Sequence, residues 1–147
     1  MDHLAIMKKS WGLIPKIIDG TKTIESRWYL KKHLPWGKIK KGDNLYFKNS
    51  GEKVSVRISV KGVKQFENLT PAKVKKTLEK YGQKDGLGIS DLSKFYRMFK
   101  DKKYCILVFL KNPQKVKPFN IDKSDFGAMS AWISVKNIKE IKVQDNL

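Results

Sequence analysis

The chain has 147 residues, the size of one ordinary domain, and 40% of them are hydrophobic, enough for a packed core. Its 32 Lys and Arg outnumber 14 Asp and Glu, and the net charge of +18 favours a polyanionic partner over a bias for solubility alone. One cysteine excludes an intramolecular disulfide, and the two histidines lack metal-ligand spacing. No apolar run is long enough to span a membrane. We therefore expect a single cytoplasmic domain over residues 1–147, a monomer without metal or cofactor.

The first half of the chain predicts four strands and a short helix. The helix has one apolar face and ends at Gly20, and its inward residues are Leu13, Ile14, Ile17 and Ile18. The strands are recognised by β-branched and aromatic residues or by alternation, and they lie at residues 3–7, 23–30, 45–48 and 54–60.

The second half predicts two helices and the closing strands. Thr70 followed by Pro71 begins the first helix, and Ser90-Asp91 caps the second. Residues 104–110 form a buried strand, whereas Pro113 and Pro118 predict an irregular segment over residues 111–120. The remaining strands are expected at residues 131–135 and 138–143. This order predicts an α+β fold: a small barrel of about six mixed or antiparallel strands with flanking helices.

The segment GTKTIESR at residues 20–27 is the most informative motif. A glycine ends the helix, a lysine follows two residues later, a glutamate three after that and an arginine two further on. With Trp11 upstream and the Gly42-Asp43 turn downstream, this pattern resembles the signature of ASCH domains, a family of the PUA-like superfamily. The resemblance covers about the first 60 residues well and the remainder only in the order of the elements.

The resemblance implies a PUA-like barrel with a cleft beside the first helix and the motif strand, and a role in RNA binding. Related bacterial members hydrolyse the acetyl amide of acetylated cytidine, with a lysine at the position of Lys22 assisting a threonine nucleophile. That threonine position holds Glu25 here, so whether the chain is an enzyme stays open. A carboxylate from the later helix of those enzymes could correspond to Glu79.

The residues of the motif also predict a ligand site by their own chemistry. Glu25 lies among cations, should stay ionised, and can accept a hydrogen bond from the amino group of a base, with Lys22 and Arg27 beside it. Trp11 and Trp36 lie in loops and are candidates for base stacking. Lys22 and Glu25 are catalytic candidates only if the protein is an enzyme. A structural ion network among Lys22, Glu25 and Arg27 is the alternative.

The remaining basic residues predict contacts with phosphates, although each run alone is typical of a solvated surface. The candidates lie in the loop after the motif and in the first long helix: Lys31, Lys32, Lys38, Lys40, Lys41, Lys73 and Lys76. The sequence thus leaves three functions open. They are an RNA- or nucleotide-binding domain, a hydrolase of a modified nucleoside or of single-stranded RNA, and a ribosome-associated interaction factor without a ligand cleft.

Overall fold

The computed structural model describes residues 1–143 and has the predicted α+β character. The strands are β1 (Asp2–Met7), β2 (Ile24–Tyr29), β3 (Asn44–Asn49), β4 (Val54–Phe66), β5 (Tyr104–Phe119) and β6 (Trp132–Val135). The helices are α1 (Leu13–Ile18), α2 (Pro71–Tyr81) and α3 (Leu92–Phe99). Short 3₁₀ turns are η1 (Lys9–Trp11), η2 (Ile89–Asp91) and η3 (Ile138–Glu140). The last four residues of the predicted domain, 144–147, lie outside the described residues.

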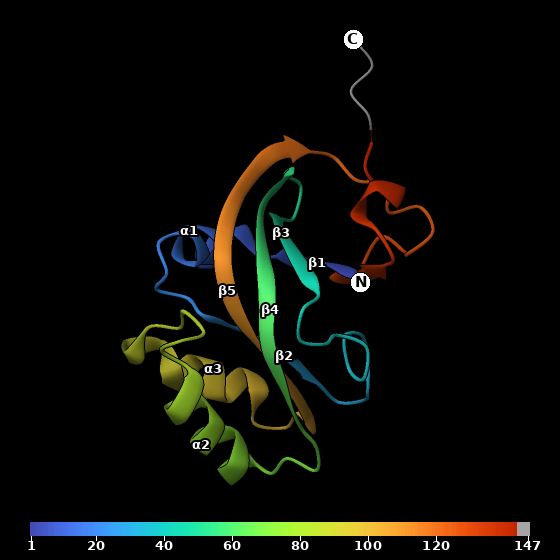
Figure 1. Cartoon of the computed structure of the whole chain (residues 1–147). Helices are drawn as coiled ribbons and strands as arrows, with labels where there is room; N and C mark the ends of the chain where they lie inside the picture. Colours follow the sequence, from blue (N-terminus) through green and yellow to red (C-terminus); the bar gives the residue numbers. More distant parts are fainter. Residues whose placement is uncertain (144–147) are drawn as a thin grey trace.

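The six strands form one mixed sheet in the order β2-β5-β4-β3-β1-β6. Strands β1 and β3 are parallel, and the other neighbouring pairs are antiparallel. The long strands β4 and β5 curve together and bend the sheet (Figure 1). Because β2 and β6 are the two edges of this curled sheet, the predicted PUA-like barrel is a half-barrel with an open seam. That seam is where the candidate site forms.

The prediction of an irregular segment over residues 111–120 was wrong, because β5 continues to Phe119. Pro113 and Pro118 cannot donate to a strand ladder, yet both lie opposite breaks in the β4–β5 register, where no regular donor is required. Asn112 beside Pro113 has a positive φ of 53°, a further sign of a bulge. The irregularities therefore bend the hairpin without ending it.

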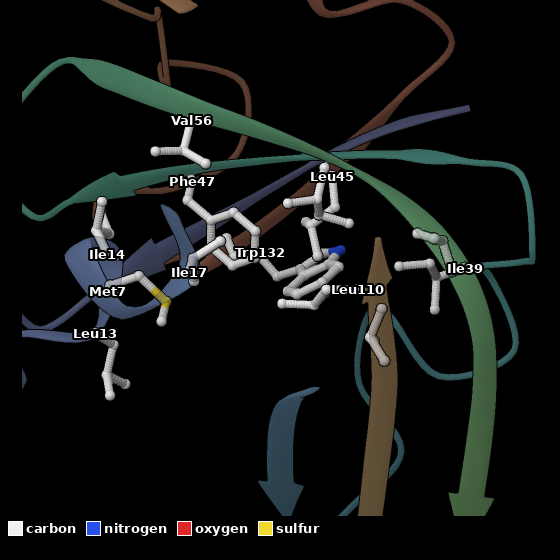
Figure 2. Packing of buried hydrophobic residues seen from close by; sticks show 14 of the residues in the cluster. Met7, Leu13, Ile14, Ile17, Ile39, Leu45, Phe47, Val56, Leu110 and Trp132 are labelled. Carbon is white, nitrogen blue, oxygen red and sulfur yellow. The ribbon is translucent and has the colours of Figure 1, made fainter. Parts of the chain in front are cut away.

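Both faces of the sheet are buried. The inner face of the curl packs Phe47, Ile58 and Trp132 against Ile17 of α1, and Figure 2 shows these aromatic rings at the centre of the cluster. The outer face packs against α2 and α3 (Figure 1). Since β5 contributes alternate residues to the two faces, its first half reads as a continuous apolar run.

The ends of the later helices and the last strand depart in part from prediction. Thr70 caps α2 as predicted, accepting a hydrogen bond from the Lys73 N–H. Asp91 precedes α3 but makes no capping hydrogen bond with its side chain. The prediction of a strand at residues 138–143 was wrong. Asn137 caps the turn η3 instead, and in this segment a single bridge pairs Lys142 with Ile121.

Candidate functional site

The motif segment turns the chain from α1 into the edge strand β2. Gly20 has a φ of 84°, the left-handed conformation that ends a helix, and the Lys22 N–H then bonds to the Lys16 carbonyl at 2.9 Å. This turn directs the Lys22 side chain inward, where it is completely buried. The glycine predicted as the end of the helix therefore also sets the position of the motif lysine.

The Lys22 ammonium is fully enclosed by oxygen acceptors. Its Nζ lies 2.6 Å from the carbonyl of Ile24 and 2.6 Å from both the carbonyl and the Oδ1 of Asp85. A carboxylate oxygen of Glu25 is 3.1 Å away. Burial by itself lowers the pKa of Lys22, but attraction to Asp85 and Glu25 outweighs it and raises the pKa above its ordinary value. Lys22 is therefore a permanent cation.

Asp85 is the charged partner of Lys22 that the sequence did not reveal. It lies in the turn after α2 and is separated from Lys22 by 63 residues. One oxygen accepts hydrogen bonds from Lys22 and from the Ser26 N–H, and the other accepts one from the Ser26 hydroxyl. Burial, together with the nearby Glu25, raises the pKa of Asp85 despite the attraction of Lys22. The carboxylate that reaches Lys22 from the α2 region is thus Asp85, whereas Glu79 is exposed on α2.

Backbone contacts hold the Asp85 turn against β2. The Lys84 carbonyl accepts hydrogen bonds from the N–H groups of Thr23 and Ile24, and the Lys16 ammonium bonds to the Gly86 carbonyl at 2.7 Å. Gly86 has a φ of 84°, and a Cβ there would lie 3.2 Å from Leu13 and 3.3 Å from Lys22. A local Asp-Gly turn is visible in the sequence, but nothing in it indicates which strand the turn will cover.

Glu25 and Arg27 complete a chain of charges along β2. The guanidinium of Arg27 bonds to one oxygen of Glu25 at 2.9 and 3.2 Å, while Lys22 approaches the other oxygen. Burial disfavours the charge of Glu25, yet the two cations outweigh burial and lower its pKa, so the carboxylate stays ionised as predicted. Arg27 lies over the Trp132 ring at 5.3 Å and bonds to the Ala131 carbonyl at 3.4 Å, which links β2 to the other edge of the sheet.

A cavity of about 280 Å³ opens between the two edges of the half-barrel. Its polar lining is Glu25, Ser26, Arg27 and Asp85 from the β2 side and Lys8 from the opposite side, where Ala131 also lies. The remaining lining is apolar or aromatic: Ile6, Met7, Trp11, Leu13, Trp28, Tyr29, Leu87 and Phe99. The opening thus combines a charged floor with aromatic walls, the composition of a ligand site.

The aromatic side chains of the cavity are held in place by contacts with neighbouring rings. The Trp28 ring stacks on Phe99 at 4.9 Å with an angle of 6° between the planes, and its indole N–H donates to the Ser26 hydroxyl. Trp11 packs edge-on against Phe95, and the Lys8 ammonium lies 5.4 Å from the Trp11 ring. Trp11 is half-buried, so part of its ring is open for a base to stack on. Lys8 is exposed and is a candidate phosphate contact that the sequence did not single out.

The structure brings together four of the predicted ligand residues but not the fifth. Trp11, Glu25 and Arg27 line the cavity, and Lys22 lies directly behind Glu25. Trp36 does not line it: the indole packs edge-on against Tyr104, with the Lys32 ammonium 5.5 Å from its ring. Trp36 is thus held by contacts of its own outside the site.

The predicted phosphate-binding lysines are surface residues. All seven are exposed: Lys31, Lys32, Lys38, Lys40, Lys41, Lys73 and Lys76. Lys32 is partly neutralised by Glu67 at 3.6 Å. Within residues 1–143, no group of three or more His, Cys, Asp or Glu side chains could hold a metal ion. The described helices also include none that is long and apolar enough to cross a membrane.

Comparison with known proteins defines the fold class. No protein-family model and no curated protein matches the chain. The crystal structure of ASCH from Zymomonas mobilis superposes with a TM-score of 0.65 at 15% identity, covering 97% of this chain and 96% of that one. The N-terminal domain of Staphylothermus marinus McrB gives a TM-score of 0.55 at 13% identity, covering 95% and 90%. The chain therefore has the fold of the Zymomonas mobilis ASCH structure, which confirms the fold that the resemblance of the motif implied.

Proposed function

We propose that the protein binds RNA or a nucleotide-like ligand, with a base in the cavity beside β2 and phosphates on the surrounding lysines. The observation that carries this proposal is the cavity itself, which places an ionised carboxylate, a guanidinium and aromatic rings in one opening. The net charge of +18 supports a polyanionic partner. The ASCH-like fold supports it as well, since the resemblance implies RNA binding.

Each group at the cavity has a role in this proposal. Arg27 donates twice to one oxygen of Glu25, whereas the other oxygen meets only Lys22 and keeps a lone pair that can accept from a base amino group. Arg27 can donate to a base carbonyl. The Trp11 ring provides the stacking surface, and Lys8 beside it can meet the first phosphate.

The test is a binding screen of nucleosides, nucleotides and short single-stranded RNAs at several salt concentrations. The logarithm of RNA affinity should fall with the logarithm of salt concentration by about 0.7 for each phosphate contacted. Binding of an uncharged nucleoside should change little with salt, because the cavity contacts are not phosphate contacts. If RNA binds through charge alone and no nucleoside or nucleotide binds, the interaction factor without a ligand cleft replaces this proposal.

A second candidate function, hydrolysis of an amide on a modified nucleoside, is favoured by the contacts of Ser26. Ser26 lines the cavity, and its hydroxyl donates to Asp85, whose pKa is raised by burial. The Trp28 N–H donates to the same hydroxyl oxygen at 3.0 Å. A serine bonded to a carboxylate can act as a nucleophile. Lys22 and Glu25, in contrast, both stay charged and are a poor pair for exchanging a proton.

In this second function, the Ser26 oxygen attacks the acyl carbon and its proton passes to Asp85. The amide C–N bond then breaks, the amine leaves with that proton, and water hydrolyses the acyl-serine ester. Incubation with N4-acetylcytidine should release cytidine, and Ser26→Ala should abolish turnover while keeping nucleoside affinity. Wild-type protein that binds the nucleoside without releasing acetate would leave only the binding function.

A further inference from the structure

We infer that a second contact surface for single-stranded nucleic acid lies at the C-terminal end of α2, outside the cavity. This Tyr81 surface consists of Lys64, Phe66, Lys80, Tyr81 and Phe109. The inference rests on the proposed function for the class of partner. Its location, however, depends on a separate set of contacts.

The aromatic part of the surface is a continuous row of three rings. Phe66 comes from β4, Phe109 from β5 and Tyr81 from the last turn of α2. The Tyr81 centroid lies 6.5 Å from that of Phe66 and 6.3 Å from that of Phe109. Each ring is only partly buried against the α2–α3 core, so each keeps an exposed portion. Exposed rings in a row suit successive bases, because every base has a face that can stack.

Two ammonium groups border these rings without carboxylate partners. Lys64 donates to the Tyr81 hydroxyl at 3.3 Å and lies 6.0 Å from the Phe109 ring. Lys80 lies 5.2 Å from the Tyr81 ring. No ion pair within residues 1–143 includes either lysine. The hydrogen bond from Lys64, helped by Lys80, lowers the pKa of Tyr81, which shows that the local field is positive.

Single-stranded nucleic acid fits this combination better than other polyanions. An acidic peptide or a duplex would engage the ammonium groups but leave the ring faces unused. Single strands offer bases for the rings and phosphates for the lysines. A lysine that lies over a ring in the free protein can move a short way to a phosphate, and the ring face then becomes available to a base.

The Tyr81 surface and the cavity lie at the two ends of one turn. Tyr81 ends α2, and Asp85, four residues later, lines the cavity. Lys84 is exposed between them, and its carbonyl is fixed by hydrogen bonds from β2. A strand with one base in the cavity can therefore cross Lys84 and reach Tyr81. Linked contacts of this kind make affinity increase with the length of the strand.

The test compares a mononucleotide with a longer single-stranded oligoribonucleotide. The variant Lys64→Gln/Lys80→Gln keeps the Tyr81 packing, and Lys136→Gln/Lys139→Gln is a control with the same charge change on two exposed lysines elsewhere. The first pair should weaken oligonucleotide binding at least tenfold more than the control and leave mononucleotide binding unchanged. Tyr81→Leu should weaken oligonucleotide binding by about 5- to 150-fold, the range for one lost base stack.

The possible outcomes separate the two proposals. Equal losses in the two lysine pairs, or an oligonucleotide that binds wild type no tighter than the mononucleotide, would refute the Tyr81 surface alone. A wild-type protein that binds neither ligand would refute the proposed function and this surface together. Melting temperatures of all variants show whether a loss of binding reflects unfolding.

Discussion

Two buried polar clusters hold together strands that are distant in the sequence, and they differ in what they face. The Lys22 cluster comprises Lys22, Glu25, Arg27 and Asp85 at the β2 edge, and three of its members line the cavity. The His3 cluster joins the His3 ring of β1 to Asp43 and to Ser134 of β6, each at 2.8 Å. None of its members lines that cavity.

The difference shows why buried polar groups alone do not identify a functional site. Both clusters satisfy their hydrogen bonds, and no buried side-chain polar atom of the described residues lacks a partner. The His3 cluster uses one neutral ring to join strands. The Lys22 cluster places Glu25, Arg27 and Asp85 at an opening, with the Lys22 ammonium behind them, so that part of their hydrogen-bonding capacity faces a possible ligand. Charge at an opening, rather than burial, is therefore the feature that points to function.

The largest effect should come from removing the central cation of the Lys22 cluster. Lys22→Met keeps the length of the side chain but leaves two buried carboxylates without their shared partner. The free energy of unfolding, measured by urea denaturation, should fall by about 3–5 kcal/mol, the range for breaking a buried ion pair. A loss below about 1 kcal/mol would mean that the cluster adds little to stability.

A smaller change, Glu25→Gln, distinguishes a ligand site from a structural network. The amide keeps the size but removes the charge, so a bond to a ligand amino group should weaken by about 1–3 kcal/mol. Isothermal titration with the best nucleotide from the binding screen measures this loss, and thermal unfolding measures stability in parallel. A destabilised variant with unchanged affinity per folded molecule would make Glu25 a purely structural residue.

The two tryptophans chosen from the sequence provide a matched pair. Trp11→Leu should weaken ligand binding by about 1–2 kcal/mol, because a stacking face at the cavity is lost. Trp36→Leu removes an indole that contacts Tyr104 outside the cavity, and it should leave affinity unchanged. Fluorescence titration of both variants measures the two ligand affinities. Equal losses would show that the ligand extends beyond the cavity.

Local signals in the sequence predicted much of the fold and the β2 half of the site. Alternation, capping residues and the Gly20 stop indicated most elements, and Lys22, Glu25 and Arg27 lie within six residues of one another, in β2 and the turn just before it. Asp85 was missed because its role depends on a contact across 63 residues, which no local pattern encodes. Pro113 and Pro118 led to the wrong prediction of an irregular segment, because the bulges that accommodate them depend on the partner strand.

The smallest expected effect concerns the His3 cluster and its dependence on pH. Burial lowers the pKa of His3 below its ordinary value of 6.5, although Asp43 partly opposes the shift. The unfolded chain therefore binds a proton at a higher pH than the folded chain does, and the folded state loses stability as pH falls below about 6.5. His3→Gln removes this titration and loses part of the hydrogen bonding, costing about 0.5–1.5 kcal/mol at neutral pH. Urea denaturation at pH 7 and pH 5 should thus show a smaller difference in the free energy of unfolding between variant and wild type at pH 5.

Nucleotide affinity at pH 7 should be the same in both proteins, because His3 does not contact the cavity. A variant with weaker nucleotide binding per folded molecule would show that the two clusters are coupled through β1, whose end, at Ile6 and Met7, lines the cavity.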